Sequence, residues 1–308
     1  MKYRLTDETI EKDGITLHRI QATKDFGDVC KGDLGGFVED EKNLSHDGNA
    51  WVYGDAKVYG NAKVYGDARV YDNAWVLDEA EVYGKALVYG NARICDNAKV
   101  HDNAEVCDKA WVYGKAKVCG DALVYDEAKV CDNAEVCGYA EVYGVAWVYG
   151  EARVFGEAQV YGDAWVCGLA RVRGNAQVYG NAWVYGKAKV CGNAKVYDNA
   201  KVYGDAQVWD KARTYGNAKV YGDALVYDEA KICDNAEVCG YAEVYGVARV
   251  YGEAFIYEEA QVYGKALVYD NAWVCGHAQV WGDALVYGDA CVCDDAWVYN
   301  ARVYSDSP

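Results

Sequence analysis

The stretch WVYGDAKVYGNAKVYGDARVYDNAWV, residues 51–76, repeats nearly the same six residues. Alanine recurs at every sixth position from Ala50 to Ala296, which gives 42 consecutive hexads without an insertion. We number the hexad from this alanine: position 1 is Ala, position 2 varies, position 3 is Val, position 4 is mostly aromatic, position 5 is Gly or Asp, and position 6 is mostly polar. A repeat of this length indicates a solenoid, in which each turn buries the face that its neighbour would expose.

Elementary physical chemistry assigns a role to each hexad position. Strand alternation places Ala at position 1 and Val at position 3 on one face, which predicts a narrow interior filled by small side chains. Positions 2 and 4 then point outward, as for Trp51 and Tyr53. Gly or Asp at position 5 predicts a two-residue corner, because these residues tolerate left-handed backbone. From Gly54 to Asp294, Glu258 is the one departure from Gly or Asp at this position.

The pattern resembles the hexapeptide repeat of left-handed parallel β-helices, in which three hexads form one triangular coil. This resemblance implies an all-β, left-handed parallel β-helix (a β-solenoid), with about 14 coils from the 42 hexads. The opening KYRLTDETIEKDGITLHRIQATKDFGDVCKGDLGGFVEDEKNLS, residues 2–45, also resembles the head of the YdcK-like family of bacterial and prophage repeat proteins, whose function is unassigned.

The repeat frame predicts three parts. We expect an N-terminal β cap at residues 1–43, the hexapeptide-repeat solenoid at 44–304 and a C-terminal tail at 305–308. The cap should cover the first coil, whose edge would otherwise offer unpaired backbone to another strand. Tyr299-Asn300-Ala301 drops one residue from the frame, so the last coil should be irregular, lightly capped and open to end-to-end contact.

Composition limits the classes of function. A net charge of −17 argues against nucleic-acid binding, which needs a positive surface. The charged start argues against a signal peptide, and no run of eighteen apolar residues is present to span a membrane. We therefore expect a cytoplasmic protein whose 13 cysteines are reduced thiols.

Few residues are candidates for catalysis or metal binding. Many hexapeptide-repeat proteins are acyltransferases that use coenzyme A thioesters and a histidine base, so the resemblance implies this activity as one option. His101 and His277 lie within hexads that carry no loop, and His18 and His46 precede the repeat. Stacking of residues three hexads apart aligns the thiol pairs Cys119/Cys137 and Cys275/Cys293, with Cys291 near the second, and we interpret this as adventitious. We expect no catalytic residue, no cofactor and no metal site.

The outward aromatic residues are the candidate interaction surface. Sorting position 2 by face, with a period of three hexads, collects six of the ten tryptophans on one face: Trp75, Trp111, Trp147, Trp165, Trp183 and Trp273. With neighbouring tyrosines, the candidate surface comprises Trp75, Trp111, Tyr113, Trp147, Tyr149, Trp165, Trp183 and Tyr185. Three interpretations stay open: a stabilising stack of aromatic rings, a self-association face, or a platform for sugar rings or bases.

An internal duplication favours the stabilising interpretation. Residues 120–162 recur at 222–264 with six changes, at an offset of 17 hexads. Because 17 is not a multiple of three, the copy should lie on a different face, and Trp147 becomes Arg249. A precise binding face would be disrupted by such a shift.

These observations predict a non-enzymatic structural or interaction scaffold, a rigid rod that associates with itself laterally along the aromatic face or end to end. The alternative is an acidic binding or decoy protein, encoded by a prophage, that engages a basic partner through its corners. The corners concerned are Asp102, Asp108, Asp126, Asp132, Asp228 and Asp234. An acyltransferase is the third option.

Overall fold

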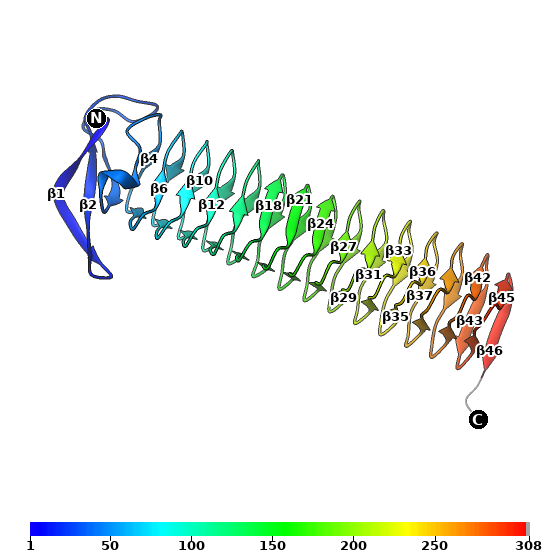
Figure 1. Ribbon diagram of the computed structural model, residues 1–308. Coiled ribbons are helices and arrows are strands. Elements are labelled where there is room, and N and C mark those ends of the chain that lie inside the picture. Colours follow the sequence, from blue (N-terminus) through cyan, green and yellow to red (C-terminus); the bar gives the residue numbers. More distant parts are fainter. Residues whose placement is uncertain (306–308) are drawn as a thin grey trace. The chain divides into compact units, whose positions relative to one another are not determined.

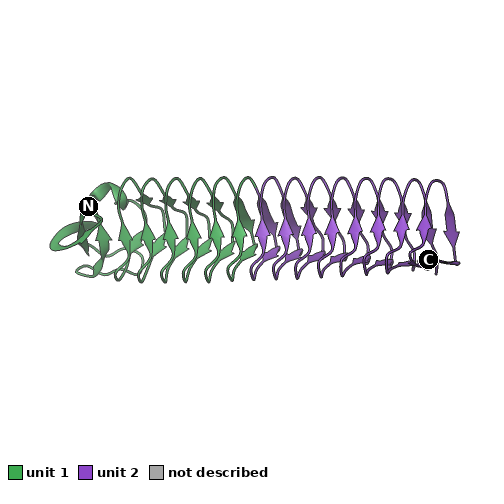
Figure 2. Ribbon diagram, turned by 90° about the horizontal axis from the view of Figure 1, so that it is seen from below, with its two compact units in different colours: residues 1–151 green, residues 152–308 purple. Residues whose placement is uncertain are grey.

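The computed structural model describes residues 1–305 and consists of two compact units, Met1–Glu151 and Ala152–Pro308 (Figure 2). Short parallel strands form the sheets of both units, and together the units contain about 15 turns of a parallel β-solenoid (Figure 1). The one helical element among the described residues is the short 3-10 helix η1 (Glu41–Asn43). The predicted all-β solenoid class is therefore confirmed, and the left-handed sense stays a prediction.

Most repeat strands cover positions 2 and 3 of one hexad. For example, β10 (Leu87–Val88) pairs in parallel with β7 (Arg69–Val70) and with β13 (Glu105–Val106). Partners are thus three hexads apart, which stacks Val70, Val88 and Val106 inside the solenoid. These side chains have no exposed surface, and burying each one contributes about 1.5–3 kcal/mol. The inward orientation predicted for positions 1 and 3 is confirmed.

Position 5 adopts the left-handed backbone that a corner requires. The φ angle is +71° at Gly66, +57° at Asp72 and +60° even at the exceptional Glu258. Aspartate at this position adds a contact that glycine cannot make: the Asp126 carboxylate accepts a hydrogen bond of 3.0 Å from the backbone N–H of Gly144, one turn further on. Each aspartate corner of this kind therefore links one turn to the next by a hydrogen bond between side chain and backbone.

The head of the chain joins the first turns of unit 1. Strands β1 (Tyr3–Lys12), β2 (Ile15–Ala22) and β3 (Leu34–Val38) pair in antiparallel order, and β3 then pairs in parallel with β5 (Lys57–Val58). Leu44 bridges Val64 of β6 (Lys63–Val64). Figure 1 shows this head at the blue end of the chain. The head thus pairs with strands that would otherwise be unpaired edges.

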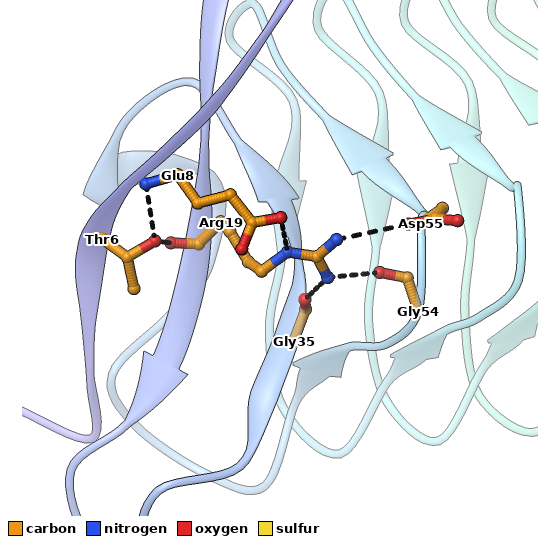
Figure 3. A network of polar contacts seen from close by, with 6 residues as sticks. All are labelled: Thr6, Glu8, Arg19, Gly35, Gly54 and Asp55. Atoms are coloured by element: carbon orange, nitrogen blue, oxygen red, sulfur yellow. Dashed lines mark hydrogen bonds and ion pairs between the residues drawn. The ribbon is translucent and has the colours of Figure 1, made fainter.

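Arg19 on β2 fixes the head to the first corner (Figure 3). Its guanidinium donates hydrogen bonds to the Glu8 carboxylate at 2.7 Å, to the Gly35 carbonyl at 2.9 Å and to the Gly54 carbonyl at 3.3 Å. A fourth contact reaches Asp55 at 3.4 Å. One side chain therefore joins β1, β3 and the corner that precedes β5.

The head also buries Trp51, the first residue of β4 (Trp51–Val52), which the hexad pattern predicted to point outward. Trp51 is only 1% exposed, because the rings of Tyr3 and Phe26 pack against it at 6.1 and 5.3 Å. Lys2 is buried beside this strand and donates to the Ala50 carbonyl at 2.7 Å, and burial lowers the pKa of Lys2 to about 8. The hexad pattern could not predict that the head covers Trp51, because the periodic pattern contains no information about the head.

The last turn differs from the others, as the sequence predicts. Strand β46 (Arg302–Ser305) pairs with β43 (Leu285–Gly288), and Arg302 lies opposite Leu285, which is one residue short of the usual three-hexad spacing. Asn300 forms the shortened corner with a φ of +49° and accepts a hydrogen bond of 2.8 Å from the Asp283 N–H. Ser305 ends β46, and residues 306–308 of the predicted tail lie outside the described residues.

No helix in the described part of the chain has the length and apolarity needed to cross a membrane.

Candidate interaction surface

In unit 1, one sheet carries the predicted tryptophans, but cations separate them. Its strands are β5 (Lys57–Val58), β8 (Trp75–Val76), β11 (Arg93–Ile94), β14 (Trp111–Val112), β17 (Lys129–Val130) and β20 (Trp147–Val148). Position 2 therefore reads Lys, Trp, Arg, Trp, Lys, Trp across neighbouring strands. The sequence already contained this alternation at the three-hexad period, but sorting the tryptophans alone did not reveal it.

The interleaved cations lie over the indole rings. The Arg93 guanidinium is 4.7 Å from the ring centroid of Trp75 and 5.8 Å from that of Trp111. The Lys129 ammonium is 4.3 Å from the Trp147 ring and 5.9 Å from the Trp111 ring. Contacts of this kind stabilise by about 0.5–1 kcal/mol at exposed sites. Much of the ring surface in unit 1 is therefore in contact with neighbouring side chains of the same sheet.

A groove of about 550 Å³ lies across the four neighbouring strands β11, β14, β17 and β20. Its lining combines side chains from position 2 with those of the preceding corners: Asn91, Arg93, Lys109, Trp111, Glu127, Lys129, Val145 and Trp147. Lys109 and Glu127 form an ion pair at 2.8 Å within it. The groove thus presents a mixed lining of aromatic rings and charges of both signs.

The two candidate tyrosines of unit 1 are half-buried beside the tryptophans. Tyr113 lies 5.2 Å from Trp111 between ring centroids, and burial raises its pKa. The Trp111 indole N–H donates to the sulfur of Cys95 at 3.2 Å. Tyr149 is likewise only partly exposed. These residues pack within the sheet more than they project from it.

In unit 2, two tryptophans of the sheet stack directly on each other. Trp165 of β23 (Trp165–Val166) stacks on Trp183 of β26 (Trp183–Val184) with ring centroids 4.8 Å apart and planes 4° apart. Tyr185 packs edge-on against Trp183 at 6.4 Å. Lys201 of β29 (Lys201–Val202) then lies 5.6 Å from the Trp183 ring. Trp147 belongs to unit 1, so unit 2 itself contains two of the three successive tryptophans that the sequence predicted.

Arg249 lies on another sheet of unit 2. Its strand, β37 (Arg249–Val250), pairs with β34 (Lys231–Ile232) and β40 (Leu267–Val268). Arg249, the duplicate of Trp147, therefore lies on a different sheet from Trp165 and Trp183, as the offset of 17 hexads predicts.

Position 4 forms long stacks of tyrosine. Tyr197 stacks between Tyr179 and Tyr215, at 4.9 and 5.0 Å between ring centroids. Tyr245 stacks in the same way between Tyr227 and Tyr263, at 4.8 Å on each side. Burial raises the pKa values of Tyr197, Tyr227 and Tyr245, and it raises that of Tyr179 to about 12. The stacks favour the interpretation in which the aromatic residues stabilise the solenoid.

The four histidines lie in separate local environments. His101 stacks on Tyr83 at 4.8 Å, and its Nδ1 lies 3.1 Å from the Asp102 carboxylate. His277 pairs with Glu259 at 3.2 Å. His46 stacks on Tyr3, and His18 Nδ1 lies 3.3 Å from the Thr6 carbonyl.

Two groups of side chains in the described residues have the spacing of metal ligands. One consists of His101, Asp102 and Cys119, and the other of Cys275, Cys291 and Cys293. Disulfide bonds join Cys119 to Cys137 and Cys275 to Cys293. The prediction that all cysteines are reduced thiols is therefore wrong for these four. The physical reason is the parallel register, which brings the Cα atoms of each pair within 4.7 and 4.5 Å.

Comparison with known proteins agrees with this geometry. Residues 62–78, 176–192 and 260–276 match a family model described as YdcK Beta solenoid repeat. The chain carries YdcK-like β-solenoid repeats. A segment of 60 residues is 38% identical to a protein of Escherichia coli (strain K12) named "Uncharacterized acetyltransferase YdcK". That alignment covers 17% of this chain and 18% of the E. coli protein, so the chain spans less than a fifth of the relative's length.

The three YdcK-like segments share one frame. Each begins at a position 1 alanine and ends at a position 5 corner, namely Asp78, Gly192 and Gly276. Each also contains one tryptophan of the candidate face: Trp75, Trp183 and Trp273. The resemblance thus extends over the core, the corners and the outward aromatic position.

Proposed function

We propose that this chain is a non-enzymatic structural scaffold whose YdcK-like solenoid associates with itself end to end through its last turn. The observation that carries the proposal is the edge strand β45 (Trp297–Tyr299), which ends its sheet and pairs with β42 (Gln279–Trp281) alone among the described residues. Trp297 is 73% exposed there and Tyr299 is 60% exposed. An unpaired strand edge beside large exposed aromatic side chains is a template for association.

The partner in this proposal is a second copy of the same end. Strand β1 of the head also pairs on one side only among the described residues, with β2, but its exposed side chains are largely charged, which opposes pairing with another strand. Two last turns can meet around a two-fold axis, which places each strand edge against its own copy. Such an isologous contact closes on itself and gives a dimer instead of a fibre.

Lateral association along the tryptophans receives less support. In unit 1 the indole rings lie against Arg93 and Lys129, and in unit 2 Trp165 and Trp183 lie against each other. A lateral partner would have to compete with these contacts.

The acidic corners also have a role within the fold. The side chains of all six corner aspartates proposed for a basic partner accept hydrogen bonds from backbone N–H groups one turn further on: Asp102, Asp108, Asp126, Asp132, Asp228 and Asp234. Their presence is accounted for without a basic partner, so we favour the scaffold over the decoy.

Point variants test the location of the contact. Trp297→Glu should convert the dimer to a monomer, because a two-fold axis brings the new charge near its own copy. Trp273→Glu is the matched control, since Trp273 is 50% exposed on the tryptophan-bearing sheet, and it should leave the dimer intact. Light scattering coupled to gel filtration measures both. Loss of the dimer in Trp273→Glu alone would show that the contact is lateral.

The name of the E. coli relative makes acetyl transfer the activity to test. We expect no binding of acetyl coenzyme A, because the 42 hexads contain no inserted loop that could enclose a cofactor and the four histidines are dispersed. Calorimetry with millimolar acetyl coenzyme A checks this expectation. Saturable binding that is lost in His101→Ala or His277→Ala would overturn the non-enzymatic proposal.

A further inference from the structure

Three cysteines converge in unit 2 because of the repeat register. Strand β44 (Cys291–Val292) pairs in parallel with β41 (Trp273–Val274), so Cys291 lies opposite Trp273 and Val292 opposite Val274. The residues that follow the two strands by one position are therefore neighbours as well, and these are Cys275 and Cys293. Cys291 and Cys293 flank the inward Val292, so both side chains lie on the outer side of the turn.

The three sulfur atoms form one compact group. All lie within 4.8 Å of one another, and the Sγ atoms of Cys291 and Cys293 are 2.8 Å apart. Cys275 is buried, Cys293 is partly exposed and Cys291 is exposed. The group therefore has a buried base and an open side that faces solvent.

Unit 1 contains a natural comparison. Cys119 and Cys137 stack across two strands in the same way as Cys275 and Cys293, and both pairs are disulfide-bonded. The residue two positions before Cys137 is Glu135, where the second pair has Cys291. A third thiol beside a stacked pair thus distinguishes the group in unit 2.

We propose that, once the Cys275–Cys293 disulfide is reduced, the thiolates of Cys275, Cys291 and Cys293 bind one soft d10 cation, Zn²⁺ or Cu⁺. Metal–sulfur bonds of about 2.3 Å in tetrahedral geometry separate sulfur atoms by about 3.8 Å, so the three sulfur atoms must move apart slightly once the disulfide is reduced. Thiolates select Zn²⁺ and Cu⁺ over harder cations. The exposed side of Cys291 provides an entry path, and for Zn²⁺ it leaves a fourth position to water.

The chemistry balances with a dithiol as the reductant. The dithiol gives two electrons and two protons to the Cys275–Cys293 disulfide and becomes a disulfide itself, which leaves three thiols in the group. Binding of the cation then displaces their three protons, because thiolate is the ligand form. Oxidation of the pair releases the cation, so the site exists in the reduced protein only. This site departs from the sequence expectation of no metal centre.

The test uses the full chain. The chain is first reduced with a dithiol, and the dithiol is then removed under anaerobic conditions. Zn²⁺ alone and Cu⁺ alone are added in separate arms, excess ion is removed by gel filtration with a weak chelator, and bound metal is measured by atomic emission. We expect about one equivalent more metal in the unaltered chain than in Cys291→Ser or Cys275→Ser. The arm that retains metal identifies the cation.

A matched control separates the site from ordinary thiols. Cys239→Ser changes a buried cysteine at position 4 on the same sheet, outside the group, and should retain the additional equivalent. The rate at which an alkylating reagent modifies Cys291 is a second readout, and the bound cation should slow it at least tenfold. Equal metal contents in the unaltered chain and in Cys291→Ser, or an equal loss in Cys239→Ser, would overturn the proposal.

Discussion

Thr214 is the one polar residue at position 3 of the hexads. It is fully buried, its hydroxyl has no hydrogen-bond partner in the described part of the chain, and its register neighbours are Val196 and Ile232. A buried hydroxyl without a partner costs about 1–3 kcal/mol. We therefore expect Thr214→Val, which preserves the shape of the side chain, to raise the free energy of unfolding by about this amount.

Denaturant unfolding monitored by circular dichroism measures the change. The reverse variant Val196→Thr, one turn away, should lower the free energy of unfolding. Equal stability of Thr214→Val and the unaltered chain would show that the hydroxyl is satisfied, for instance by a water molecule.

Substitutions at Asp126 distinguish two properties of a position 5 residue, namely its positive φ and the hydrogen bond that its side chain accepts. Its φ of +57° disfavours a β-carbon, and its carboxylate accepts the hydrogen bond from Gly144. We expect Asp126→Asn to be nearly neutral. Asp126→Ala should lose about 1 kcal/mol of stability, because it loses the hydrogen bond and keeps the β-carbon strain, whereas Asp126→Gly should lose less, because removing the β-carbon relieves about 1 kcal/mol of strain. Hydrogen exchange at the Gly144 amide should accelerate in the Gly and Ala variants. A loss of stability in Gly equal to that in Ala would contradict the backbone part of this explanation.

At the scale of elements, the attachment of the head depends on Arg19. Removing its contacts with Glu8, Gly35 and Gly54 in Arg19→Ala should free β1 to β3 from β5. We expect faster hydrogen exchange in residues 1–38 and unchanged exchange in the repeats beyond the first turns. Arg4→Ala is the control, because Arg4 is exposed and its side chain donates hydrogen bonds to Gln21 within the head. Equal effects of the two variants would show that Arg19 does not hold the head.

Sequence periodicity predicted the repeat elements well because each hexad position has one dominant physical demand. The inward orientation of alanine and valine follows from their small apolar side chains. The left-handed backbone at Gly54 and Asp72 follows from the tolerance of Gly and Asp for positive φ. The burial of Trp51 could not be predicted, since it depends on how the non-repeating head folds over β4. The alternation of Lys57, Trp75 and Arg93 was present in the sequence. The position of each cation over an indole ring depends on side-chain conformations, which the sequence pattern does not specify. The disulfides likewise depend on side-chain geometry at the cysteine pairs.

At the scale of the whole molecule, the tyrosine stacks predict sensitivity to alkaline pH. Burial raises the pKa values of the stacked Tyr125 and Tyr179 to about 12, whereas a tyrosine in the unfolded chain titrates near 10. Between these values the unfolded chain has released protons that the folded chain retains, so stability falls as pH rises through this window. Lys2 acts in the opposite direction from about pH 8, because its pKa is lowered by burial, but it is a single group.

We expect the thermal unfolding midpoint to decrease steeply above pH 10. Most of the phenolate absorbance should appear together with the loss of circular dichroism, since the stacked rings ionise at a lower pH in the unfolded chain than in the folded chain. Complete ionisation of tyrosine with retained β-sheet signal would contradict the stabilising role of the stacks.

The measurement that tests the scaffold proposal most directly is sedimentation equilibrium of the purified chain over a wide range of concentration. An isologous contact between two last turns predicts a single monomer–dimer equilibrium whose limiting mass is twice the 33.9 kDa of the monomer. A mass of one monomer at every concentration, or a series that grows without limit, would contradict the proposed end-to-end dimer.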